Sequence, residues 1–129
     1  MPGRYLLDTN VVIALFNGDS GIEARLQAAP EILLSPVVLG ELYFGAAKSG
    51  RPEENRAKVE AFAAACPLVG IDGLTALEYG AVKNGLKRKG KPIPENDVWI
   101  AAGAVRHGLV LVTRDGHFDR VEGLQFERW

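Results

Sequence analysis

The sequence has little of three things on which other classes of protein depend: cysteine, long apolar runs and an excess of charge of one sign. Its single cysteine, Cys66, has no partner in the chain for a disulfide, and a lone thiol is typical of a reducing compartment. No apolar run approaches the roughly 20 residues that a membrane-spanning helix needs. Fifteen basic and sixteen acidic residues nearly cancel, so a nucleic-acid partner would need a local basic patch. We expect a soluble, cytoplasmic protein.

What the sequence does contain is a regular alternation of short apolar runs with longer stretches of helical pattern. Strands are predicted at Tyr5 to Leu7, Ile32 to Leu34, Leu68 to Ile71 and Leu109 to Val112. Helices are predicted from Asp8 or Thr9 to Phe16, Ile22 to Ala29, Pro36 to near Ser49, Pro52 to about Cys66, from Asp72 into KRKGK, and over VWIAAGAV to His107, with TRDGHF as a turn after the last strand. Asp8 or Thr9, Ser35 and Asp72 are the predicted helix caps.

Short, wholly apolar strands separated by helices are typical of a parallel sheet that is covered on both faces. The 129 residues are enough for one core, and no linker or internal repeat divides them. We therefore predict that residues 1–129 form a single three-layer α/β domain, in which helices flank a short central parallel sheet.

Acidic residues follow the ends of two predicted strands. Asp8 comes directly after the first strand, and Asp115 lies three residues past Val112, where the last clear strand ends. Because ligand sites of open α/β sheets lie beyond the carboxyl ends of the strands, both acids are expected at the same edge. Asp97, in the first turn of its helix, and Glu41, one turn into the helix after the second strand, are expected near that edge as well.

Each of these acids also has an ordinary structural explanation. Asp8 can cap the helix that follows it, and Asp97 complements the dipole at the start of its helix. Asp115 precedes Gly116, which suits a turn. Glu41 is flanked by apolar residues, and a glutamate is almost never buried without a partner, although an outward-facing stripe would accommodate it.

Four segments, taken in order, resemble those of the PIN domain family. They are LLDTNVVIAL, SPVVLGELYFGA, NDVWIAAGAV with its Asp-x-x-Ile-Ala-Ala pattern, and LVTRDGHFDRVEGL. Together they cover essentially the whole chain, and its compact length most resembles the VapC-like toxins of bacterial and archaeal toxin–antitoxin pairs. The resemblance implies a PIN-like fold and a catalytic, metal-binding quartet of acids, which in this sequence are Asp8, Glu41, Asp97 and Asp115.

The resemblance also implies polar residues that support the quartet. Asn10 lies where a polar residue follows the first aspartate, and Thr113 where the family often has a hydroxyl. His117 departs from the pattern, because many relatives carry another acid at this position. Contact with the substrate and capping of the turn are both open as its role.

The chemistry of the quartet favours a hard divalent cation. Closely spaced carboxylates repel one another, so they need a counter-charge or protons. Oxygen ligands suit Mg²⁺, with Mn²⁺ as a second possibility, and we expect one or two ions. A zinc site is not indicated, since Cys66, His107 and His117 lack suitable spacing. We expect in-line hydrolysis of a phosphodiester that leaves 5′-phosphate and 3′-hydroxyl ends. The resemblance implies RNA as the substrate, and thus a metal-dependent endoribonuclease that acts as a toxin.

Basic residues gather just before the Asp97 helix, in KNGLKRKGKP. Lys87 and Arg88 in this stretch, together with Arg114 beside Asp115, are predicted to contact phosphate. The alternative is a solvated helix end whose lysines complement the helix dipole. The resemblance further implies a separate antitoxin protein and a homodimer.

Two other functions compete with this hypothesis. A PIN-like binding module without catalytic activity would act only through its partners, and the loss of an acid would be its sign, yet all four are present. A phosphotransfer or phosphatase domain also places an aspartate after its first strand. However, dehalogenase-type phosphatases need a second aspartate two residues later, where this chain has Asn10.

Overall fold

The structure, a computed structural model, describes residues 3–129 and confirms the predicted α/β class. Over these residues, four parallel strands form one sheet in the order β2-β1-β3-β4. The strands are β1 (Arg4–Leu7), β2 (Glu31–Leu33), β3 (Val110–Val112) and β4 (Phe126–Glu127).

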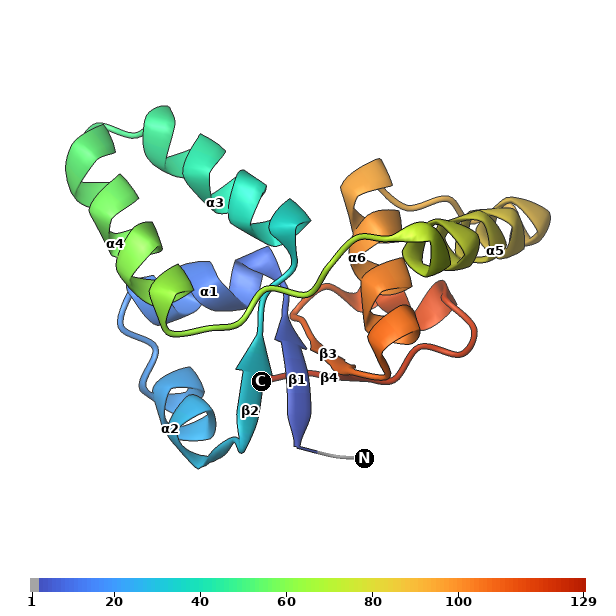
Figure 1. Ribbon diagram of the computed structural model, residues 1–129, viewed down its shortest axis with the longest axis horizontal. Helices are drawn as coiled ribbons and strands as arrows, with labels where there is room; N and C mark the ends of the chain where they lie inside the picture. The colour runs from blue at the N-terminus through green and yellow to red at the C-terminus, as the bar shows by residue number, and fades with distance from the viewer. Residues whose placement is uncertain (1–2) are drawn as a thin grey trace.

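Six α-helices and one 3-10 helix, counted over residues 3–129, pack around this sheet (Figure 1). They are α1 (Thr9–Phe16), α2 (Ser20–Ala28), α3 (Pro36–Ala47), α4 (Pro52–Ala64), α5 (Gly73–Lys89), α6 (Glu95–His107) and the 3-10 helix η1 (Gly116–Arg120). Helices α1 to α4 lie to one side of the strands in Figure 1, and α5 and α6 lie to the other. Helix α3 packs against α4, and α5 packs against α6.

The central strands are apolar because helices cover the sheet. Leu6 and Leu7 of β1, and Leu111 and Val112 of β3, are completely buried. The register pairs Leu7 with Val112, so the residues that follow, Asp8 and Thr113, leave the sheet side by side. Burial of the two strand ends thus places polar groups from distant parts of the sequence at one edge.

The predicted helix caps are present. The carboxylate of Asp8 accepts a hydrogen bond from the amide of Thr9 at the start of α1. Ser35 caps α3. Asp72 begins α5 in a reciprocal capping box with Thr75, which satisfies two amides that the helix itself leaves unpaired. These local patterns place the helix starts close to where the sequence predicts them.

Two local predictions need correction, and one strand was not predicted. The predicted strand from Leu68 to Ile71 is wrong, because only Leu68 pairs, through a single bridge to Leu34. The predicted turn TRDGHF continues from Gly116 as the 3-10 helix η1. The short strand β4, which was not predicted, pairs with β3 and depends on long-range hydrogen bonds, such as that from the Leu111 amide to the carbonyl of Gln125 (2.9 Å).

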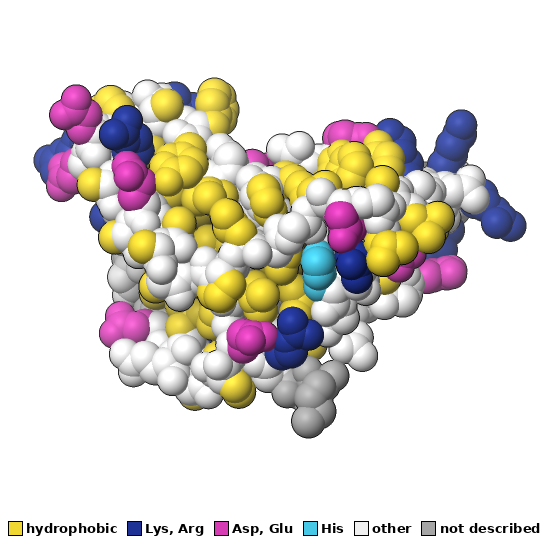
Figure 2. Space-filling model, in the orientation of Figure 1, with side chains coloured by type: hydrophobic (Ala, Val, Ile, Leu, Met, Phe, Trp, Pro, Cys, Tyr) yellow, Lys and Arg dark blue, Asp and Glu magenta, His cyan; other side chains and the backbone are white. Residues whose placement is uncertain are grey.

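Exposed apolar side chains gather in the segment that leads into α5. Figure 2 shows hydrophobic side chains across the middle of the face where this segment crosses the molecule. The exposed apolar side chains are Leu68 and Ile71 in this segment, and Leu74 and Leu77 at the start of α5 itself. Across residues 3–129, no helix is long and apolar enough to cross a lipid bilayer.

Candidate active site

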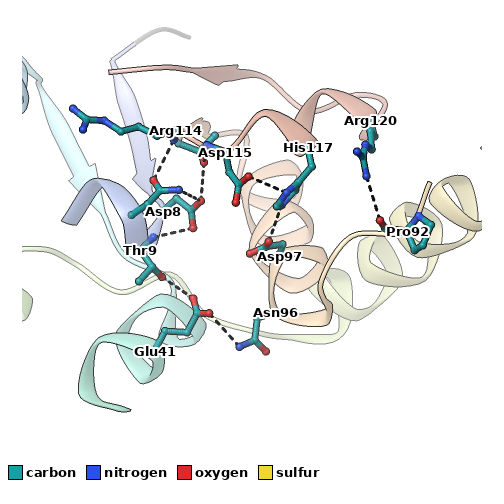
Figure 3. A network of polar contacts seen from close by, with 12 residues as sticks. Asp8, Thr9, Glu41, Pro92, Asn96, Asp97, Arg114, Asp115, His117 and Arg120 are labelled. Atoms are coloured by element: carbon teal, nitrogen blue, oxygen red, sulfur yellow. Dashed lines mark hydrogen bonds and ion pairs between the residues drawn. The ribbon is translucent and has the colours of Figure 1, made fainter. Parts of the chain in front are cut away.

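The four predicted acids line one cavity of about 530 Å³, although they come from four separate parts of the fold. Asp8 follows β1, Glu41 lies on α3, Asp97 lies in the first turn of α6, and Asp115 lies between β3 and η1 (Figure 3). Thr9, Asn10, Ile13 and Asn96 contribute to the same wall. The structure therefore brings together the quartet that the sequence predicts.

Asp8 is the most enclosed of the four acids, with only 4% of its surface exposed. One carboxylate oxygen accepts the Thr9 amide at 2.8 Å, and the other accepts the Thr113 hydroxyl at 2.7 Å. Burial raises the pKa of the Asp8 carboxyl, whereas the hydrogen bonds from Thr113 and Thr9 lower it. The result is a carboxylate held in place by donors yet short of compensating positive charge.

Thr113 and Asn10 both lie where a supporting role is predicted. The buried hydroxyl of Thr113 donates to Asp8 and accepts the amide of Asp115 at 2.9 Å, so it joins two of the acids. The side-chain amide of Asn10 donates to Asp8 at 3.4 Å, and its oxygen accepts the backbone amide of Arg114 at 3.1 Å.

The Arg114 side chain does not lie as its predicted phosphate contact would require. Its guanidinium forms a 2.7 Å ion pair with Asp19 and donates to the Trp129 carbonyl at 2.9 Å. The Arg114 side chain therefore connects the loop before Asp115 to Asp19, the N-cap residue of α2, and to Trp129, which follows β4. This geometry favours a structural role for Arg114 over the predicted contact with substrate.

Glu41 is held by two residues that were not predicted to belong to the site. The hydroxyl of Thr9 donates to one carboxylate oxygen at 2.6 Å, and the side-chain amide of Asn96 lies 3.4 Å from the other (Figure 3). Each adjoins an acid of the quartet, since Thr9 follows Asp8 and Asn96 precedes Asp97. Both Thr9 and Asn96 are polar residues next to a predicted ligand, and this pattern would have identified them as supporting residues of the site.

His117 lies between the remaining two acids. Its Nε2 atom is 2.7 Å from Asp97 Oδ2, and its Nδ1 atom is 3.0 Å from Asp115 Oδ1 (Figure 3). Burial raises the pKa of the Asp97 carboxyl, the contact with His117 lowers it, and the charges of Glu41 and Asp115 raise it further.

Lys87 and Arg88 lie on the last turns of α5, away from the four acids. Figure 2 shows basic side chains projecting at this end of the molecule. Lys87 lines a neighbouring cavity of about 400 Å³ together with Lys83, and Glu95 belongs to the walls of both cavities. Arg88 is exposed and points about 100° further around the helix axis. Lys83, the first residue of the basic stretch KNGLKRKGKP, forms a 2.8 Å ion pair with Glu95.

The donor groups in the acidic cavity fit a divalent cation. Within residues 3–129, no lysine or arginine forms a salt bridge with Asp8, Glu41, Asp97 or Asp115. Burial, together with the charges of neighbouring acids, raises the pKa values of the Asp8 and Asp97 carboxyls, and the basic group in contact with Asp97 and Asp115 is the imidazole of His117. Carboxylate oxygens are the ligands that Mg²⁺ and Mn²⁺ prefer.

Comparison with curated proteins finds relatives over nearly the full length of the chain. The chain is 38% identical to a protein of Haemophilus influenzae named Ribonuclease VapC2, with 98% of each covered. It is 34% identical, over the same share of both chains, to a protein of Shigella flexneri named tRNA(fMet)-specific endonuclease VapC.

Comparison with solved structures gives the same grouping. A chain of the DNA-bound VapBC structure from Salmonella typhimurium superposes with a TM-score of 0.92 at 34% identity, with 98% of each chain covered. A chain of VapBC2 from Rickettsia felis, bound to a promoter DNA fragment, gives a TM-score of 0.87 at 30% identity, covering 97% of this chain and 98% of that one. The family model described as PIN domain matches residues 5–124. By its sequence, its fold and its converging acids, the chain belongs to the PIN domain family.

Proposed function

We propose that this protein is a metal-dependent endoribonuclease and the toxin of a toxin–antitoxin pair. The observation that carries the proposal is the convergence of Asp8, Glu41, Asp97 and Asp115 on one cavity at the carboxyl ends of β1 and β3. Relatives named as ribonucleases and as tRNA endonucleases support RNA as the substrate. A cytoplasmic location is part of the same proposal. A catalytically silent module would not need all four acids in one cavity.

The proposed reaction is hydrolysis of a phosphodiester by water. A bound Mg²⁺ or Mn²⁺ ion supplies positive charge for the phosphate and makes water a better nucleophile. The carboxylates of Asp8, Glu41, Asp97 and Asp115 would hold one or two such ions. Thr113 and Thr9 keep Asp8 and Glu41 oriented, because each donates a hydrogen bond to a carboxylate oxygen. Because the reaction does not use the 2′-hydroxyl as nucleophile, the products carry 5′-phosphate and 3′-hydroxyl ends.

The basic end of α5 is the proposed contact for RNA that extends beyond the cavity. Lys83 and Lys87 line the neighbouring cavity, which shares Glu95 with the acidic one. An RNA backbone that extends from the acidic cavity past Glu95 would bring its phosphates to these lysines first. Arg88 lies further along the helix. Such contacts add affinity that falls with salt and contribute little to sequence choice.

We place the antitoxin in a groove between α1, α3 and α4. This groove, about 250 Å³ in volume, is lined by Ile13, Phe16, Asn17, Glu41, Leu42, Gly45, Ala46, Asn55, Lys58 and Val59. It shares Ile13 and Glu41 with the acidic cavity, so the two adjoin. An apolar segment of the antitoxin that ends in a basic side chain would fill the groove and present positive charge to the acids. VapBC complexes among the similar structures support such a partner.

The homodimer that the family resemblance implies is a further part of the proposal. The first residues to test are Leu74 and Leu77, which expose apolar side chains on α5. Changing both to glutamate should lower the molar mass measured by light scattering after gel filtration from that of a dimer to that of a monomer. An unchanged mass would place the interface elsewhere, or show that there is none.

The deciding experiment is cleavage of RNA by the purified protein, free of any antitoxin. Initiator tRNA and a mixture of total RNA are incubated with Mg²⁺, with Mn²⁺ or with excess chelator. We expect cleavage with either ion, none with chelator, and a loss of about 100-fold or more in Asp8→Asn. Asp119→Asn, a change at an exposed acid outside the cavity, is the matched control and should retain full activity.

Three results would contradict the proposal. They are full activity in excess chelator, products that end in 2′,3′-cyclic phosphate, and undiminished cleavage by Asp8→Asn. Mapping the ends of the tRNA fragments also identifies the cleaved bond.

A further inference from the structure

His117 is the one histidine in contact with the acidic site, and its surroundings do not match either role suggested by the sequence. A turn cap would bond to the backbone, but both ring nitrogens face carboxylates, at 2.7 Å from Asp97 and 3.0 Å from Asp115. A substrate contact would face the cavity, yet the cavity wall is formed by Asp97 and Asp115, with the imidazole between them. The ring is directed at the proposed metal ligands.

The position of the imidazole is well determined by its neighbours. Only 18% of the side chain is exposed, and its ring lies 4.9 Å, centroid to centroid, from the ring of Phe118. Phe118 is completely buried and anchors η1, the short helix that carries both residues. Packing against buried Phe118 therefore holds the imidazole ring beside the two acids.

The spacing of the donor atoms suits joint coordination of one ion. One ligand atom from each of Asp97, Asp115 and His117 can be chosen so that all lie within 4.8 Å of one another. Neighbouring ligands of an octahedral ion are about 3 Å apart, because each lies about 2.1 Å from the ion. The separation of 2.7 Å between His117 Nε2 and Asp97 Oδ2 is already close to this value. Asp115 Oδ1 contacts the other ring nitrogen, Nδ1, at 3.0 Å, so coordination of one ion through Nε2 requires the Asp115 carboxylate to turn toward that atom.

We propose that His117 is a nitrogen ligand of the metal site, together with Asp97 and Asp115, and that it shifts the preference of the site from Mg²⁺ toward Mn²⁺. This inference rests on the proposed metal-dependent function. Mg²⁺ binds oxygen almost exclusively and gives up its waters reluctantly, whereas imidazole is a good ligand for transition metals. A histidine in place of an oxygen ligand therefore penalises Mg²⁺ more than Mn²⁺.

The test is pulsed electron paramagnetic resonance of Mn²⁺ bound to the whole protein, because it detects a directly coordinated ¹⁴N nucleus. The chain has only two histidines, which supplies a matched pair of variants. His107 Nε2 donates to the carbonyl of Gly70 (2.9 Å), at the opposite end of α6 from Asp97. We expect nitrogen modulation in the parent protein and in His107→Gln, and its loss in His117→Gln. Labelling the parent with ¹⁵N-histidine should change the modulation frequencies without any mutation, so the test survives if a variant fails to fold.

Metal preference provides the second readout. In His117→Glu, an oxygen ligand replaces nitrogen, and the ratio of Mn²⁺ to Mg²⁺ affinity should fall about tenfold, measured by competition for the bound Mn²⁺ signal. Bound Mn²⁺ without modulation from histidine nitrogen would overturn the ligand role of His117 and leave the nuclease proposal intact. Absence of any bound Mn²⁺ or Mg²⁺ would overturn both.

Discussion

The side chain of Thr113 donates a 2.7 Å hydrogen bond to the carboxylate of Asp8, across 105 positions of the sequence. The pairing of Leu7 with Val112 in adjacent strands brings the two residues together, because each is the first residue beyond its strand. The same hydroxyl accepts the amide of Asp115, so a single buried oxygen aligns acids from both strand ends.

Replacing Thr113 by valine should weaken metal binding and destabilise the protein. Valine keeps the shape of the side chain but leaves a buried carboxylate oxygen and the Asp115 amide without this partner. We expect metal affinity to fall about 10- to 100-fold and the free energy of unfolding to fall by about 1–3 kcal/mol. Titration with Mn²⁺ and urea denaturation measure the two effects. Thr113→Ser keeps the hydroxyl and should recover most of both, and failure of serine to do so would argue against the hydrogen bonds as the cause.

Asp8→Asn should abolish cleavage without lowering stability in chelator. Because burial raises the pKa of Asp8 in the folded state, the group contributes stability below the ordinary value of 3.8 and loses it as the pH rises through the raised pKa. At neutral pH the charged Asp8 carboxylate therefore destabilises the folded state, and asparagine removes this charge. The melting temperature of metal-free Asp8→Asn at pH 7 should equal or exceed that of the parent. A marked decrease would show that the cap on α1 outweighs the cost of the buried charge.

Thr9→Val should reduce activity through Glu41. The Thr9 hydroxyl donates a 2.6 Å hydrogen bond to Glu41, and valine removes this donor but keeps the backbone amide that donates to the Asp8 carboxylate. We expect a loss of about tenfold in cleavage rate and in Mn²⁺ affinity. The double variant Thr9→Val with Glu41→Gln should behave like Glu41→Gln alone, since a residue that acts through Glu41 has nothing left to orient. Independent, multiplying losses would mean that Thr9 acts by another route.

Charge reversal at the end of α5 tests the RNA contact. Changing Lys87 to glutamate should weaken RNA binding and reduce the slope of log affinity against log salt by about one. Arg88→Glu should have a smaller effect, because Lys87 alone of the two lines the cavity next to the acids. Filter binding over a series of salt concentrations measures both quantities. If neither variant changes the affinity or its slope, the basic stretch serves only to end the helix.

The ion pair between Asp72 and Arg106 should contribute stability that depends on acid pH. Arg106, together with the amide of Thr75, holds the pKa of the Asp72 carboxyl well below its ordinary value of 3.8. A lowered folded-state pKa means that this stability is present above pH 3.8 and is lost as the pH falls below that value. In Asp72→Asn, the decline of the melting temperature with acid should be shallower than in the parent. Equal slopes would show that the pair is too exposed to matter.

Much of the site was predictable because a change from apolar to polar residues marks where each strand ends. Leu7 and Val112 end buried strands, so the polar residues after them had to emerge at one edge of a parallel sheet. Glu41 was conspicuous in its apolar helix for a related reason, because a buried charge needs partners.

Other features depended on which side chains tertiary packing brings together. The pairing of Thr9 with Glu41 requires α1 to lie against α3, and that of His117 with Asp97 requires η1 to lie beside α6. The ion pair that occupies Arg114 joins it to Asp19, 95 positions earlier, and β4 pairs with β3 through only two residues of its own.

The sequence by itself determined the α/β class, the helix caps and the identities of the four acids, because periodicity, capping and strand ends are local properties of the chain. Only the tertiary structure decided which donors hold each acid, that Arg114 is engaged elsewhere and that an imidazole lies between Asp97 and Asp115. These outcomes depend on distances of about 3 Å between residues remote in sequence, and such distances follow from the register of the sheet and the packing of the helices.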